Sequence, residues 1–251
     1  MDSVKKIPQH FIVASLFLGY LLFGLGIYKD YGISWADPIS RQNGQVAYEY
    51  VTGQGSRLLT YVDRDYGTAL ELPLVGLEKA FRMTSTREIY FMRHLVTFLL
   101  FFISTIFFYV MARKRFGSVL ALAGTAMLIL SPRIFADSFY NSKDIGLLSV
   151  LIIAVASMQY FLERMSWRRA LVHAVICAFV VDLRMPGIMI VALTIVFYVL
   201  DSLLVPAKRK MWMKRIKPIL LYLVFFCFFT VLFWPYLWIN PVGHFIEAYR
   251  N

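Results

Sequence analysis

Charged residues are scarce in this sequence. Asp, Glu, Lys and Arg make up 16% of its 251 residues, whereas 59% are hydrophobic and 17% are aromatic. The mean hydropathy is +0.64. Soluble domains rarely combine such values, and apolar stretches of about 20 residues are long enough to cross a bilayer. The composition therefore excludes an ordinary soluble domain and indicates a membrane protein.

Cysteine and histidine are also rare. The two cysteines, Cys177 and Cys227, both fall within apolar stretches, so the segments between these stretches offer no pair for a disulfide. The four histidines are isolated from one another and lack the spacing of metal ligands: His10, His94, His173 and His244. We predict no metal and no other cofactor.

Seven apolar stretches are candidates for membrane spans. Their approximate ranges are 7–28, 91–112, 117–134, 145–162, 170–183, 187–204 and 217–239. The fifth stretch is short for a full span, so we expect it to tilt, to stop below the interface, or to form a hairpin with the sixth around residues 184–187. The predicted fold is an all-α polytopic membrane protein with about seven transmembrane helices.

The net charge of +11 is distributed unevenly between the two sides of this topology. With the N-terminus in the cytoplasm, the inner segments hold 14 of the 26 basic residues and three of the 15 acidic ones. An excess of Lys and Arg on the cytoplasmic side sets the orientation of membrane proteins. The basic excess thus predicts topology, with a minor share for contact with anionic membrane lipid, and does not indicate a nucleic-acid partner.

The chain has no detectable repeat and forms a single predicted module over residues 1–251. The first span at 7–28 is expected to be an uncleaved anchor, and residues 94–239 supply the remaining spans. Because the sequence stops soon after the last span, we expect a further C-terminal part to be missing.

Residues 29–93 form a long charged outer loop, which is unusual between tightly connected spans. We expect interfacial helices at 46–51 and 68–82. This loop is the predicted roof of an active site. A second outer loop, at 131–144, is short.

Ionisable residues near membrane depth are candidates for function because their burial there is costly. Acids and bases from separate segments are predicted to meet at the outer face, where they suit an anionic lipid headgroup and a general base. The candidates are Asp37, Asp63, Asp65, Arg93, His94, Asp137, Lys143, Asp144, Asp182 and Arg184.

Each candidate also has a plainer interpretation. Asp37 can start a turn before Pro38 or cap a helix, and Asp63 and Asp65 can be solvated. The charges at 137–144 can belong to an ordinary loop or cap the fourth helix. The basic side chains near the interface, with His94, can anchor the protein to phospholipid without specificity.

Three motifs resemble membrane glycosyltransferases of the GT-C superfamily, nearest to the dolichyl-phosphate-mannose protein mannosyltransferases and the aminoarabinose transferases. They are YGISWADPISRQNG at 31–44, DYGTALELP at 65–73 and SPRIFADSFYNSKD at 131–144. The resemblance extends over about residues 7–245. It implies a seven-helix module whose first outer loop carries interfacial helices.

The resemblance also implies a donor sugar linked to a polyprenyl or dolichyl phosphate. An acid after the first helix activates the acceptor, and the matching residue is Asp37, although Ala36 stands where relatives usually have a first acid. We expect Asp137 and Asp144 to share the catalytic role. The carrier phosphate is expected to contact Arg93, His94, Lys143 and Arg184, together with Asp63, Asp65 and Tyr66.

The predicted activity is inverting sugar transfer to a protein, lipid or glycan acceptor at the extracytoplasmic face. The membrane would be the inner membrane of a bacterium or the endoplasmic reticulum of a eukaryote. Two alternatives stay open. One is a truncated or catalytically impaired homologue, because of Ala36. The other is a transporter or flippase for lipid-linked sugars, although transporters usually have mid-membrane charges or repeats.

Overall fold

The computed structural model describes residues 9–206 and 212–250, which form helices and no strand. Five helices within these ranges are long and apolar enough to cross a membrane. Many large apolar side chains on them are exposed, among them Phe11, Leu22, Val119 and Leu204. A soluble protein would bury such side chains, whereas lipid accommodates them. The prediction of an all-α polytopic membrane protein is confirmed.

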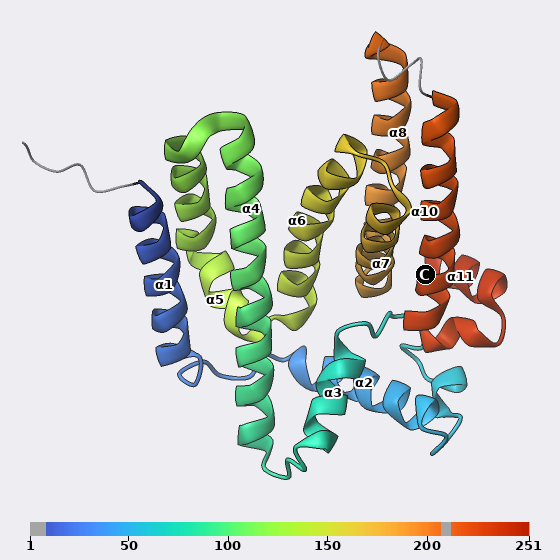
Figure 1. Cartoon of the computed structure of the whole chain (residues 1–251). Coiled ribbons are helices and arrows are strands. Elements are labelled where there is room, and N and C mark those ends of the chain that lie inside the picture. The colour runs from blue at the N-terminus through green and yellow to red at the C-terminus, as the bar shows by residue number, and fades with distance from the viewer. Residues whose placement is uncertain (1–8, 207–211, 251) are drawn as a thin grey trace, which may run out of the picture.

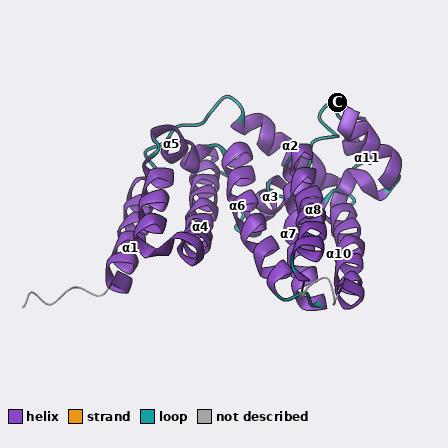
Figure 2. Cartoon of the chain, turned by 90° about the horizontal axis from the view of Figure 1, so that it is seen from above, coloured by secondary structure: helices purple, strands orange, loops and turns teal. Residues whose placement is uncertain are grey.

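The first helices form a small group on one side of the molecule (Figures 1 and 2). Helix α1 spans Gln9–Ile27, and α4 spans Thr86–Leu130. The chain of α4 folds back at Gly117, where φ is +79°, a conformation that glycine adopts without steric cost. The two arms of α4 therefore correspond to the predicted spans at 91–112 and 117–134.

Helices α6 (Ser142–Glu163), α7 (Trp167–Leu183), α8 (Ile188–Leu204) and α10 (Trp212–Phe233) form the rest of the membrane bundle. Helix α6 contacts both α4 and α7 and so joins the two groups. Helix α7 packs closely because small residues, Ala170, Ala174 and Ala178, are fully buried on it. It has 17 residues and is not among the five long apolar helices. Its short connection to α8 is the 3₁₀ helix η2 (Met185–Gly187), as the hairpin alternative predicted.

The remaining elements gather at the end of the bundle where α1 ends and α6 begins (Figure 1). They are α2 (Asp37–Val51), η1 (Arg57–Thr60), α3 (Glu71–Ala80), α5 (Pro132–Tyr140), η3 (Pro235–Trp238) and α11 (Pro241–Arg250). We call this the outer end, following the predicted orientation. The second helix of the first loop matches the expected 68–82. Helix α2 is much longer than the expected 46–51, because Pro38 starts the helix early. The short second loop also forms a helix, α5.

Aromatic packing fixes α5 against the first group of helices. The rings of Phe98 and Phe139 stack with their centroids 5.0 Å apart, and Tyr20 of α1 meets Phe98 edge-on at 5.4 Å. These three side chains are buried. A Cβ on Gly24 would lie 2.0 Å from the Phe98 ring, so a larger residue at this position would displace that buried ring. Because α6 follows α5 directly in the sequence, this packing also positions the first residues of α6, which belong to the candidate site.

Candidate active site

Asp37 is the first residue of α2, and its side chain is buried. Its Oδ2 atom accepts a hydrogen bond from the backbone N–H of Ser34 at 2.8 Å. Burial raises the pKa of this carboxyl, the bond from Ser34 and the charge of Arg93 oppose that rise, and the charge of Glu71 adds to it. The contact with Ser34 closes a turn, so the plainer interpretation of Asp37 also has a basis. A buried carboxylate with a raised pKa is nonetheless the kind of group that serves as a general base.

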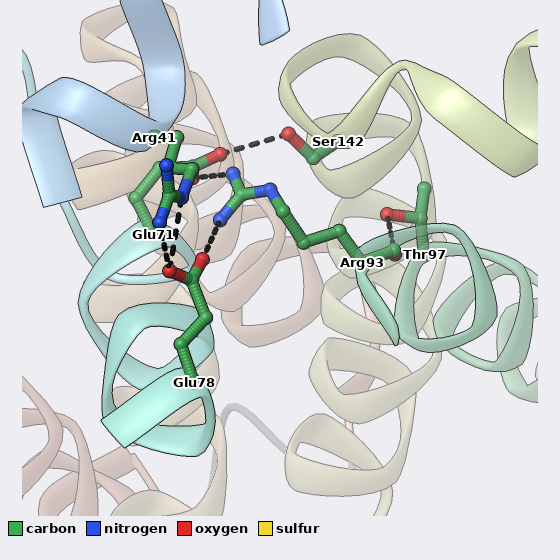
Figure 3. A network of polar contacts seen from close by, with 6 residues as sticks. All are labelled: Arg41, Glu71, Glu78, Arg93, Thr97 and Ser142. Carbon is green, nitrogen blue, oxygen red and sulfur yellow. Dashed lines mark hydrogen bonds and ion pairs between the residues drawn. The ribbon is translucent and has the colours of Figure 1, made fainter. Parts of the chain in front are cut away.

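A second feature of the outer end is a charged network that joins Arg41, Glu71, Glu78 and Arg93 (Figure 3). The last three are buried, whereas the side chain of Arg41 is 25% exposed. The guanidinium of Arg93 donates to Glu71, and it lies 3.4 Å from Oε1 of Glu78. Oε2 of Glu78 also accepts from Nε of Arg41 at 2.9 Å. The hydroxyl of Ser142, at the start of α6, donates to Glu71 at 2.8 Å. The network therefore ties α2, α3, α4 and α6 together at the outer end.

This network accounts for the charge of Arg93, which sequence analysis assigned to the carrier phosphate. Arg93 is 3% exposed, and both of its terminal nitrogens face carboxylates. The sequence alone did not predict Glu71 and Glu78 as its partners. Their spacing of seven residues was the available signal, because it places both carboxylates on one face of a helix.

Lys143 and Arg184 form a second charged group with Tyr66 and Asp144, which we call the cation cluster. Nζ of Lys143 lies 4.4 Å from the centre of the Tyr66 ring. Nη2 of Arg184 lies 2.7 Å from Oδ1 of Asp144. The Nε atom of Arg184 is buried and has no hydrogen-bond partner within the described residues. The cluster thus brings two cations together with one unused buried donor.

Asp144 is already bound within this cluster. Its backbone N–H donates to Oδ1 of Asn141 at 3.0 Å, and its Oδ2 accepts from the Asn141 amide at 3.0 Å. These reciprocal bonds cap the start of α6, as one of the plainer interpretations held. Asp144 therefore orients Arg184, and its predicted catalytic role gains no support from these contacts.

The other predicted residues lie at the outer end but outside these two groups. Asp137 on α5 lies 3.7 Å from Arg133, one helical turn earlier. Nδ1 of the buried His94 donates to the carbonyl of Tyr28 at 3.3 Å, which ties α4 to the end of α1. Asp63 and Asp65 form no ion pair with described residues, although the charge of Asp63 acts on Lys143.

One further acid among the outer-face candidates, to which no specific catalytic or binding role was assigned, is buried at the site. Asp182, near the end of α7, is fully buried, and its Oδ1 accepts from the backbone N–H of Thr68 at 3.0 Å. The first outer loop approaches so closely here that a Cβ on Gly67 would lie 1.4 Å from the carbonyl oxygen of Asp182. This contact fixes the chain next to Tyr66. The contact between the first outer loop and Asp182 could not be predicted from local sequence, because the two segments lie far apart in the chain.

The described residues contain no group of three or more His, Cys, Asp or Glu side chains that could hold a metal ion. The side chains described above at the outer end supply carboxylates, cations and hydroxyl groups. They suit proton transfer to a carboxylate and the binding of an anion.

Comparison with known proteins identifies a family. A family model described as dolichyl-phosphate-mannose-protein mannosyltransferase matches residues 87–234, more than half of the chain. No curated protein and no solved structure matches. The matched segment contains both cations of the cation cluster, Lys143 and Arg184, whereas Asp37 and Tyr66 precede it.

Proposed function

The chain belongs to the dolichyl-phosphate-mannose-protein mannosyltransferase family, and we propose that it transfers a sugar from a polyprenyl or dolichyl phosphate to an acceptor at the outer end of its helices. Membership makes it a membrane glycosyltransferase of the GT-C type. The donor, the acceptor side and the residue roles are our proposal.

The cation cluster is the proposed site for the carrier phosphate. Lys143 supplies a compact charge, and Arg184 offers the unpartnered Nε donor beside the nitrogen bound to Asp144. Hydrogen bonds from such cations to phosphate are charge-assisted and strong. They become stronger as the phosphate takes on negative charge in the transition state, which is the condition for lowering the barrier.

Asp37 is the proposed general base. Its carboxylate removes the proton from the acceptor hydroxyl while that oxygen attacks the anomeric carbon of the sugar. The bond between this carbon and the phosphate oxygen breaks, and both of its electrons leave with the polyprenyl phosphate. Attack from the face opposite the leaving group inverts the anomeric configuration. The leaving group is already an anion, so the reaction needs little acid catalysis there.

The observation that carries this proposal is that Glu71 is linked both to Asp37 and to the start of α6, which carries Lys143. Its charge acts on both Asp37 and Lys143, and Ser142, which bonds to it, immediately precedes Lys143. The base and the cation cluster therefore belong to one charged region at the outer end. An arrangement of this kind supports chemistry at the membrane surface more than transport through the bilayer.

The donor class is the decisive test. The purified protein would be reconstituted in vesicles and given either a sugar linked to a polyprenyl phosphate or the same sugar linked to a nucleotide. We expect consumption of the lipid-linked donor and release of polyprenyl phosphate, with no use of the nucleotide sugar. Use of the nucleotide sugar alone would overturn the proposal.

A further inference from the structure

The last part of the described chain, residues 234–250, folds over two segments of the cation cluster. We call it the C-terminal clasp. Trp234, Tyr236, Leu237 and Ala248 form a small buried cluster in it, against which Leu59 and Met185 pack. Leu59 lies in the first outer loop, and Met185 directly follows Arg184 in sequence. The clasp therefore contacts both the loop that leads to Tyr66 and the turn that carries Arg184.

Three polar contacts fasten the clasp to the first outer loop, and we call them the latch. They join the side chains of Arg64, Tyr236 and Glu247. Nη2 of Arg64 lies 2.7 Å from Oε1 of Glu247, and its Nε donates to the Tyr236 hydroxyl at 3.2 Å. That hydroxyl donates to Oε2 of Glu247 at 2.7 Å. Each of the three side chains thus contacts the other two.

Arg64 of the latch stands two residues before Tyr66, a member of the cation cluster. Tyr66 is 47% exposed, and its ring contacts Lys143. The backbone of the loop is held on the far side of Tyr66 by Thr68 and Asp182. Arg64 holds it on the near side, so the latch limits the positions that Tyr66 can take.

We propose that Glu247 and Tyr236 are positioning residues that set the affinity for the carrier phosphate by holding Arg64, and hence Tyr66 against Lys143. The inference rests on the proposed function, because it assumes that the cation cluster binds this phosphate. It assigns to a helix outside the membrane bundle a role in donor recognition.

The latch is suited to such a role because it is partly open to solvent. The side chains of Arg64 and Glu247 are 34% and 37% exposed. Ion pairs at this exposure contribute little to the free energy of folding and are screened by salt. Removing one partner should loosen the loop without unfolding the protein.

The experiment measures donor binding and turnover in the Glu247→Gln variant of the full chain in vesicles. We expect about a two- to fivefold rise in KM for the lipid-linked sugar, within the range that an exposed ion pair can contribute, with kcat nearly unchanged. Binding of polyprenyl phosphate alone should weaken by the same factor. Glu88→Gln is the matched control, because Glu88 is an exposed carboxylate at the outer end that forms no ion pair with any described residue.

Two further measurements separate positioning from a general structural effect. The exchanged pair Arg64→Glu with Glu247→Arg should restore most of the lost affinity. High salt should weaken binding in the wild type more than in Glu247→Gln. A wild-type affinity for polyprenyl phosphate in Glu247→Gln, or no rescue by the exchanged pair, would overturn the inference.

The proposed function fails in a different way, as the absence of sugar transfer by the wild-type protein. The binding measurement uses polyprenyl phosphate without sugar, so it still decides the inference in that case.

Discussion

The carboxylate of Asp182 accepts a hydrogen bond from the backbone N–H of Thr68 at 3.0 Å, although 114 residues separate them. Both residues are buried. Because an unpaired buried carboxylate is costly, this bond favours the docked position of the first outer loop on α7. The loop carries Tyr66 just before this point, so the contact connects the membrane bundle to the proposed donor site.

The Gly67→Ala substitution tests this docking. The new Cβ would lie 1.4 Å from the carbonyl oxygen of Asp182, and backbone must move to accept it. We expect a loss of about 1–3 kcal/mol in the free energy of unfolding, together with weaker binding of polyprenyl phosphate. Gly55→Ala is the control, because no atom lies within 4 Å of the corresponding Cβ. Thermal unfolding in detergent and a binding titration measure both effects, and equal behaviour of the two variants would contradict the docking.

Arg93→Ala tests whether the buried network holds the outer end together. The substitution leaves the carboxylates of Glu71 and Glu78 buried without their shared partner. We expect a loss of about 3–5 kcal/mol, as for other buried pairs that lose one partner. Arg87→Ala, at an exposed position on the same helix, should change stability little. A stable Arg93→Ala protein that has lost only phosphate binding would instead support the direct phosphate contact predicted from the sequence.

The fold was predictable where it depends on local patterns. Apolar length gave the spans, and the turn at Gly117 and the short α7 match the sequence ranges. The uneven distribution of charge between the two sides predicted that the candidate residues lie at the same end of the bundle. Pairing was not predictable, because it depends on contacts between distant segments. Arg93 resembles a free interfacial cation until α3 places Glu71 and Glu78 beside it, and Arg64 resembles a solvated charge until Glu247 reaches it.

Arg184 and Arg168 offer a comparison of two arginines at opposite ends of α7. Arg184 follows the end of α7 at the outer end, and Arg168 lies at its start. Arg184→Ala should weaken binding of polyprenyl phosphate by about tenfold or more, because hydrogen bonds to charged groups contribute about 1.5–3 kcal/mol. Arg168→Ala should leave the affinity nearly unchanged. Equal effects in a binding titration would remove Arg184 from the donor site.

The orientation in the membrane can be tested by cysteine labelling. In a Cys227→Ser background, which keeps only the buried Cys177, one cysteine at a time would be added, in place of Gly55 in the first outer loop or of Arg115 near the fold-back of α4. An impermeant maleimide added to intact cells should label position 55 only, because the basic excess predicts that position 115 is cytoplasmic. Labelling of both positions from outside would contradict the topology and the proposed outer-face site.

Asp37→Asn tests the proposed base directly. Asparagine keeps an oxygen that can accept the bond from Ser34 but cannot take a proton from the acceptor. We expect transfer to fall about 10²- to 10⁴-fold, the usual contribution of a general base, while binding of polyprenyl phosphate changes little. Ala36→Asp is the companion variant, because it places an acid where relatives usually have one. We expect it not to raise transfer, since Asp37 is the buried carboxylate near Arg93.

The pH dependence of transfer gives an independent check on Asp37. Its pKa is raised in the folded protein, chiefly by burial. Since the base must be ionised, transfer should decline as the pH falls through this raised pKa, at a higher pH than for an ordinary carboxyl. The linked stability has the opposite sense: a raised pKa favours the folded state at low pH, and this gain is lost as the pH rises through the folded pKa. Asp37→Asn should therefore lose no stability at neutral pH while it loses activity.

If transfer survives in Asp37→Asn and rises in Ala36→Asp, the base belongs to position 36 in relatives and this chain is an impaired enzyme. If neither variant changes transfer, neither position carries the base.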